Sequence, residues 1–187
     1  MEEISLHILD IAENCITAGA TNIIIKVYEN KKKNLLRIDI EDNGKGMDNE
    51  QLQKAVDPFF TSRTTRKVGM GLSLLKQAAT AANGKMEIKS RYGKGTIVNA
   101  IFQLDHIDRQ PLGNLADTLI ALISRSPDIE IFFSYQKNGK KFIFDTKEVK
   151  KKIKGLAINT PTVLVFLKKF IEENIMLISK ERKNATV

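Results

Sequence analysis

Two polar residues near the start of the chain have a spacing that could support metal or proton chemistry. Asp10 and Asn14 belong to residues 4–17, where apolar residues recur at helical spacing. Side chains four residues apart point to the same side of a helix. A carboxylate and a carboxamide placed in this way could hold a water molecule and give one oxygen ligand to a hard divalent cation. A solvated helix face shows the same pattern, so the pair alone decides nothing.

Two glycine-containing turns add a second kind of chemistry. Asp42-Asn-Gly-Lys-Gly-Met47 follows the β-branched run of residues 35–40, with Glu41 between them. A carboxylate at a strand end can accept a hydrogen bond from an exocyclic amine, and Gly44 and Gly46 let the backbone turn close to a flat ligand. Gly69-Met70-Gly71-Leu72 opens a helical segment, whose free N–H groups and dipole favour phosphate. This second turn fits neither the Walker nor the Rossmann glycine pattern.

Further residues could contact the same ligand. The irregular stretch 57–71 carries Arg63, Arg66 and Lys67, whose cationic side chains could contact phosphate groups. Thr96 begins a later strand-like run, where its hydroxyl could share a water molecule with Asp42. Each piece is weak evidence alone, and the order in which the pieces occur is far more specific.

Helices and strands in a mixed order must position these residues. Hydrophobic periodicity, turn residues and β-branched runs define the elements. The predicted helices cover residues 4–17, 49–56, 72–82, 115–124, 149–153 and 162–178, and the predicted strands cover 23–28, 35–40, 85–90, 96–104, 129–135 and 141–145.

The combined pattern resembles the GHKL ATPase superfamily, which includes gyrase, heat-shock chaperone ATPases, histidine kinases and MutL. Residues 13–21 are similar to the N box of MutL and gyrase, and Asp42–Met47 to the G1 box. Asp57-Pro-Phe-Phe-Thr-Ser62 resembles the F box that opens the ATP lid of histidine kinases, and residues 69–75 resemble their G2 box. The resemblance covers roughly residues 1–105.

The resemblance implies a fold and a set of ligand contacts. The fold would be α+β, a Bergerat-type two-layer sandwich with a mixed, mostly antiparallel sheet and helices on one face. Asn14 would bind Mg²⁺, and Asp42 would recognise the adenine amine of ATP. Gly44 and Gly46 would make room for the purine. The remaining nucleotide contacts would come from Met47, Thr61, Arg63, Gly69, Met70, Gly71, Leu72 and Thr96.

The sequence departs from the family at the expected general base. Hydrolytic members usually carry Glu four residues before the magnesium Asn, and this chain carries the shorter Asp10. Reach is the first requirement for a base, so hydrolysis would be slow. His7 is either a surface histidine or a residue that orients Asp10 or a γ-phosphate. Neither His7 nor His106 is a good phosphoacceptor, so we do not expect a complete sensor histidine kinase.

Composition limits the class of protein. The chain has 187 residues, of which 42% are hydrophobic and 28% charged, a composition typical of a globular protein. Its net charge of +8 suits an acidic ligand, an acidic protein partner or nucleic acid. Trp is absent and aromatic residues make up 6%, which leaves few side chains to stack on bases and argues against nucleic-acid binding. The single cysteine, Cys15, is expected in the core. With no membrane span and no signal peptide in the pattern, we expect a cytoplasmic protein.

The chain is predicted to divide into an ATP-binding domain over residues 1–112 and a small α+β segment over residues 113–187. From Asp145 onward the chain has ten Lys and Arg but only five Asp and Glu, so this segment could dock an acidic partner. The favoured function is a stand-alone module that binds ATP or ADP with Mg²⁺ and phosphorylates or conformationally regulates a protein partner. The alternatives are an ATP-dependent DNA repair or topology factor of the MutL or gyrase type, and a binding module without catalysis. The sequence leaves the oligomeric state open.

Overall fold

The computed structural model describes residues 3–55 and 70–180, which form one mixed sheet covered by helices. The strand order in the six-stranded sheet is β3-β4-β2-β1-β5-β6. Only β1 and β5 pair in parallel, and every other neighbouring pair is antiparallel. The helices are α1 (Ile4–Thr17), α2 (Asn49–Ala55), α3 (Met70–Ala81), α4 (Leu115–Arg125), α5 (Thr146–Lys152) and α6 (Pro161–Ser179). The strands are β1 (Asn22–Asn30), β2 (Leu35–Asp42), β3 (Lys85–Arg91), β4 (Gly95–Gln103), β5 (Glu130–Lys137) and β6 (Lys140–Asp145).

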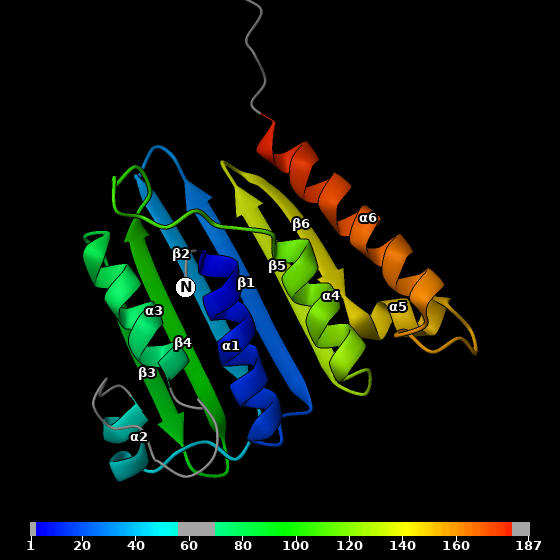
Figure 1. Ribbon diagram of the computed structural model, residues 1–187, viewed down its shortest axis with the longest axis horizontal. Coiled ribbons are helices and arrows are strands. Elements are labelled where there is room, and N and C mark those ends of the chain that lie inside the picture. The colour runs from blue at the N-terminus through cyan, green and yellow to red at the C-terminus, as the bar shows by residue number, and fades with distance from the viewer. Residues whose placement is uncertain (1–2, 56–69, 181–187) are drawn as a thin grey trace, which may run out of the picture.

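The helices α1, α3, α4 and α6 lie on the same side of the sheet (Figure 1). Burial along β1 alternates in agreement: Ile23, Ile25 and Val27 are fully buried under the helices, whereas Lys26 points to the open side. This two-layer arrangement confirms the predicted α+β fold with a mostly antiparallel sheet and helices on one face.

Helix α1 is the central helix of this layer and packs between α3 and α4. Its apolar positions Ile4, Ile8 and Ile11 are buried against the sheet, as their helical spacing predicts. The start of the helix has no side-chain cap. Instead, the linker after β4 supplies acceptors, because the N–H groups of Ile4 and Ser5 donate to carbonyl oxygens of residues 111 and 112 at 3.0 and 2.9 Å.

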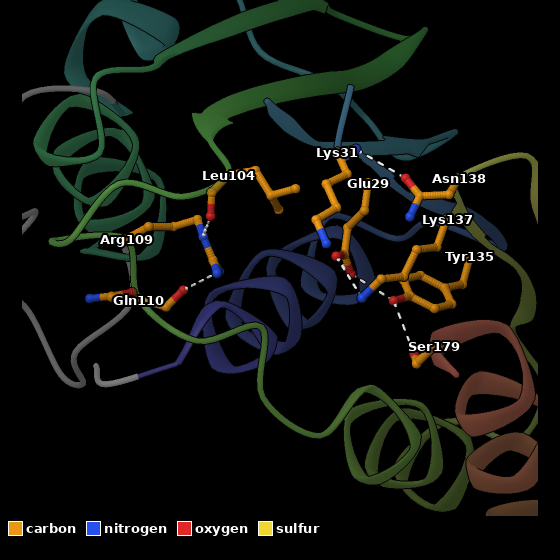
Figure 2. A network of polar contacts seen from close by, with 9 residues as sticks. All are labelled: Glu29, Lys31, Leu104, Arg109, Gln110, Tyr135, Lys137, Asn138 and Ser179. Atoms are coloured by element: carbon orange, nitrogen blue, oxygen red, sulfur yellow. Dashed lines mark hydrogen bonds and ion pairs between the residues drawn. The ribbon is translucent and has the colours of Figure 1, made fainter. Parts of the chain in front are cut away.

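The C-terminal segment extends the same sheet, because β5 pairs in parallel with β1. The division at residue 112 therefore falls in the linker that contacts the start of α1, and it stays a proposal about how the chain is organised. Figure 2 shows the polar contacts of the linker residue Arg109 and, separately, those of Glu29 with β5. Arg109 donates to the carbonyl oxygens of Leu104 and Gln110, at 2.5 and 2.9 Å, and so holds the linker in shape.

A buried polar group ties β1 to β5. The Tyr135 hydroxyl donates to Glu29 Oε1 at 2.6 Å, and Lys137 Nζ lies 3.1 Å from Glu29 Oε2 (Figure 2). Burial and the hydrogen bond to Glu29 raise the pKa of Tyr135, so the phenol stays a donor. The buried carboxylate is thus satisfied by groups from the C-terminal segment.

Within residues 3–55 and 70–180, no helix combines the length and the apolar content needed to cross a lipid bilayer.

We predict that Tyr135→Phe lowers the free energy of unfolding by about 1–3 kcal/mol, because the buried Glu29 carboxylate loses a hydrogen-bond donor. Urea denaturation followed by circular dichroism measures this change. Ser179→Ala is the matched control, since Ser179 Oγ lies 3.4 Å from the same hydroxyl and its loss leaves the Glu29 contact intact. A Tyr135→Phe protein as stable as the wild type would contradict the role given to this contact.

Candidate functional site

A cavity of about 250 Å³ lies between α1, α3 and the adjoining strands β2 and β4. Six residues predicted as ligand contacts line it: Asn14, Asp42, Gly46, Met47, Leu72 and Thr96. The other lining residues are mostly apolar and come from the same elements and the segments that follow them: Ile11, Cys15, Thr17, Ala18, Ile40, Lys45, Ala55 and Val98. The structure therefore brings the opening helix and the first glycine turn to one hollow surface.

Asp42 is a buried carboxylate at the end of β2, with 7% of its surface exposed. Its Oδ1 accepts a hydrogen bond from the Gly44 N–H at 2.7 Å, which fixes the side chain. A carboxylate can accept several more hydrogen bonds, so Asp42 keeps acceptor capacity for a ligand. Thr96 stands directly opposite Asp42 in the β2–β4 register, on the same face of the sheet.

The two glycines after Asp42 serve close packing of the backbone. Gly46 has φ +64, and a Cβ there would overlap the main chain of Arg91 and Gly95. Gly44 does not line the cavity, and a Cβ there would lie 2.9 Å from Asp42 Oδ1 and 3.0 Å from the Ala18 carbonyl oxygen. Close packing therefore favours glycine at both positions, in addition to the role in making room for a purine that the resemblance implies.

Ser90 contacts two residues of the candidate site, although the sequence analysis did not predict a role for it. Its hydroxyl accepts from the Met47 N–H at 2.8 Å and lies 2.9 Å from Thr96 Oγ1. It therefore joins the first glycine turn to the strand that carries Thr96. Its position in β3 opposite Thr96 in β4 becomes visible only once the hairpin register is known.

Cys15 is a second contact that the sequence did not assign to the site. It is buried, as predicted for a core residue, and it also lines the cavity beside Asp42. Burial, followed by the negative charge and hydrogen bond of Asp42, raises the pKa of the Cys15 thiol, so it stays protonated. Its place directly after Asn14 is the signal that could have found it.

Asp10 contacts the start of α3. A Cβ on Gly71 would overlap the Asp10 carboxylate, so a glycine is required for this close approach. Asp10 is not among the residues that line the cavity, and lies one turn before Asn14 on α1. Burial, together with the negative charge of Glu13, raises the pKa of Asp10, which makes the carboxylate a stronger base than an exposed aspartate.

His7 is buried, with 1% of its surface exposed, which overturns the interpretation of this residue as a surface histidine. Its Nε2 donates to the Gln110 amide oxygen at 2.9 Å, so Nδ1 is the acceptor of the neutral ring. Nδ1 is buried and has no hydrogen-bond partner in the part of the chain that the structure describes. Burial lowers the pKa of His7, while Gln110 and Asp10 act in the opposite direction.

Three of the predicted contacts, Thr61, Arg63 and Gly69, lie outside the described residues, as do Arg66 and Lys67. Met70 is the first residue of α3, and its side chain is outside the description as well. Gly71 and Leu72 place the first turn of α3 next to Asp10 and the cavity.

Residues 2–106, more than half of the chain, match the sequence profile of the histidine kinase-, DNA gyrase B- and HSP90-like ATPases. The chain is a member of this family, the GHKL ATPases. This match confirms the family that the sequence motifs predicted.

Among curated GHKL relatives, the sensor protein kinase FleS of Pseudomonas aeruginosa is 37% identical over 97 residues, which are 52% of this chain and 24% of that protein. The anti-sigma F factor of Caldanaerobacter subterraneus subsp. tengcongensis is 33% identical over 97 residues, which are 46% of this chain and 64% of that protein. The chain thus spans less than two thirds of the length of either relative. Among solved structures, the N-terminal domain of a DNA repair protein is 18% identical with a TM-score of 0.51, covering 76% of this chain and 52% of the other, a likeness of fold alone.

We predict that acid destabilises this GHKL domain partly through His7. Because the folded protein holds the pKa of His7 below its ordinary value of 6.5, stability is full above that value and is lost as the pH falls toward the lowered pKa. Urea denaturation at pH 7 and pH 5 should therefore show a smaller pH-dependent loss for His7→Gln than for the wild type. His106→Gln, at the other and more exposed histidine, is the control. An equal loss in wild type and His7→Gln would contradict this account.

Proposed function

We propose that the chain binds Mg²⁺-ATP in the cavity between α1, β2, β4 and α3. The observation that carries the proposal is the buried Asp42 carboxylate, held by the Gly44 N–H in an otherwise largely apolar cavity. A buried acceptor surrounded by apolar walls suits a flat ligand that brings its own donor, and the adenine ring with its exocyclic amine is such a ligand. Membership of the GHKL ATPases supports this choice.

We propose that the metal and phosphate contacts come from α1 and the first turn of α3. Asn14 would give Mg²⁺ one oxygen ligand, and the nucleotide phosphates and water would supply the rest, as Mg²⁺ commonly allows. Within the described residues there is no cluster of three or more His, Cys, Asp or Glu that could hold a metal. The first turn of α3, with Met70, Gly71 and Leu72, would meet the phosphates, and Thr61, Arg63 and Gly69 are proposed to join it.

The proposed activity acts on another protein. ATP bound here would either donate its γ-phosphate to a protein partner or hold the chain in a conformation that regulates that partner, with slow hydrolysis as a side reaction. The matching relatives support this class, since they are called a sensor protein kinase and an anti-sigma F factor. The basic C-terminal segment is the proposed docking region for the partner. The DNA repair alternative gains no support from the solved structure, because that likeness is one of fold alone.

We expect Asp42→Ala to weaken ATP binding by about 10- to 100-fold, since a hydrogen bond to a charged acceptor is lost. Isothermal titration calorimetry with Mg²⁺-ATP measures the affinity. Asp39→Ala is the matched control, because Asp39 lies on the same strand with its partner Arg37 on the open face of the sheet. The wild type should also prefer ATP to GTP, which lacks the exocyclic amine at that position. Unchanged affinity in Asp42→Ala would refute the proposed site.

Asp10→Asn should leave ATP affinity within about threefold of the wild type and lower any hydrolysis by about 100-fold, because the amide cannot accept the proton of an attacking water. In this reaction water attacks the γ-phosphorus, Asp10 takes its proton, and ADP and inorganic phosphate leave. Incubation with γ-labelled ATP and candidate partner proteins separates label on free phosphate from label on protein. Asp39→Asn, the same chemical change on the open face of the sheet, is the control. Phosphate release at the wild-type rate from Asp10→Asn would place the base elsewhere.

A further inference from the structure

Exposed apolar side chains gather on one helix of the C-terminal segment. Among the residues that the structure describes, eleven large apolar side chains are exposed, and five of them belong to α6. The other six are spread over α1, β4, β6 and three connecting segments. A concentration of this kind is typical of a protein interaction surface. The five are Val165, Phe166, Phe170, Met176 and Leu177, with exposed fractions of 71, 68, 40, 56 and 62%.

The opposite side of α6 is already used. Val163, Leu167 and Ile171 are buried, and the helix packs on α4, β5 and β6. Phe170 contacts Phe142 of β6 edge-to-face at 5.8 Å, which fixes the base of the exposed surface. In Figure 1 the helix is the outermost element at its end of the molecule, so its other side is open to solvent.

The order of apolar and charged residues on the outer face of α6 is complementary to the same order read in the opposite direction. Counted outward from position 171, three pairs of exposed residues lie at equal distances on either side, whereas Phe170 has Glu172 as its counterpart. An apolar pair lies farthest out, a second apolar pair lies next, and a pair of opposite charge is nearest the centre. These pairs are Val165 with Leu177, Phe166 with Met176, and Lys169 with Glu173.

The charged pair is available for contacts outside the helix. Within one α6, Lys169 Nζ and Glu173 Oε1 are 3.9 Å apart, and their side chains are 77% and 62% exposed. A surface pair at this distance contributes little, so both charges can meet a partner at low cost.

We propose that this outer face of α6 binds a second copy of the chain, with the two α6 helices antiparallel about a two-fold axis at residue 171. A two-fold interface requires a surface that complements itself, and this pattern provides that property. Every pair then occurs twice, so that Lys169 of each copy lies beside Glu173 of the other.

The interface would leave the nucleotide cavity untouched. The cavity is built from α1, α3, β2 and β4, whereas α6 contacts α4, β5 and β6. The dimer should therefore form equally well with and without nucleotide, and its failure would leave the proposed nucleotide site unaffected. One face of a 19-residue helix is smaller than a standard protein interface, so association should depend on concentration in the micromolar range.

Sedimentation equilibrium of the full chain, from about 1 µM to about 1 mM, tests the proposal. We expect a monomer–dimer equilibrium in the wild type. Lys169→Glu or Glu173→Lys should each weaken dimerisation by about tenfold, because each creates two like-charge contacts and removes two favourable ones. Lys76→Glu, the same charge change on the exposed side of α3, is the matched control, and circular dichroism checks that every variant is folded.

Two recovery experiments make the test specific to an antiparallel two-fold pair. An equal mixture of Lys169→Glu and Glu173→Lys chains should form heterodimers as tightly as the wild type, because every 169–173 contact again joins opposite charges. The double variant, which carries both changes in one chain, should likewise dimerise. A wild type that stays monomeric over the whole range, single variants that dimerise as well as the wild type, or a mixture that stays monomeric would each overturn the proposal.

Discussion

The buried carboxylate of Asp42 is the constraint around which the cavity is built. A carboxylate with 7% exposure needs hydrogen-bond donors, and the chain supplies one by turning back so that the Gly44 N–H reaches Oδ1. The same turn is held at both ends. Asn43 Oδ1 accepts from the N–H groups of Thr21 and Asn22, and the Lys45 N–H donates to the Ala18 carbonyl oxygen at 2.9 Å. The end of α1 and the start of β1 thus hold the turn that positions the Asp42 carboxylate.

Local patterns predicted most of the fold. The apolar spacing of residues 4–17 gave helix α1 with both ends correct, because its buried stripe is a property of the helix alone. Two of the hairpin turns could be predicted equally well, since Asn34, Asn138 and Gly139 have positive φ, which these residue types favour. What local patterns cannot show is the parallel pairing of β5 with β1, which joins segments about 100 residues apart and makes the C-terminal segment an extension of the sheet.

The residues that line the candidate cavity were predictable in part, and their environments less so. Asn14, Asp42 and Thr96 could be proposed from residue type and order, since ligand chemistry restricts those choices. His7 could not be placed, because Gln110, which bonds it, comes from a linker 103 residues later. Ser90 was missed because a serine gives no signal until the β3–β4 register puts it beside Thr96. Burial and distant partners, rather than spacing, decide such cases.

NMR mapping of backbone amides on addition of Mg²⁺ and a non-hydrolysable ATP analogue is the sharpest test of the nucleotide site. The largest chemical-shift changes are predicted at Asn14, Asp42, Gly46, Leu72 and Thr96, which line one cavity, with β6 and α5 unaffected. Changes confined to the open face of the sheet or to the C-terminal segment, or no changes at saturating analogue, would contradict the claim that this cavity is a nucleotide site.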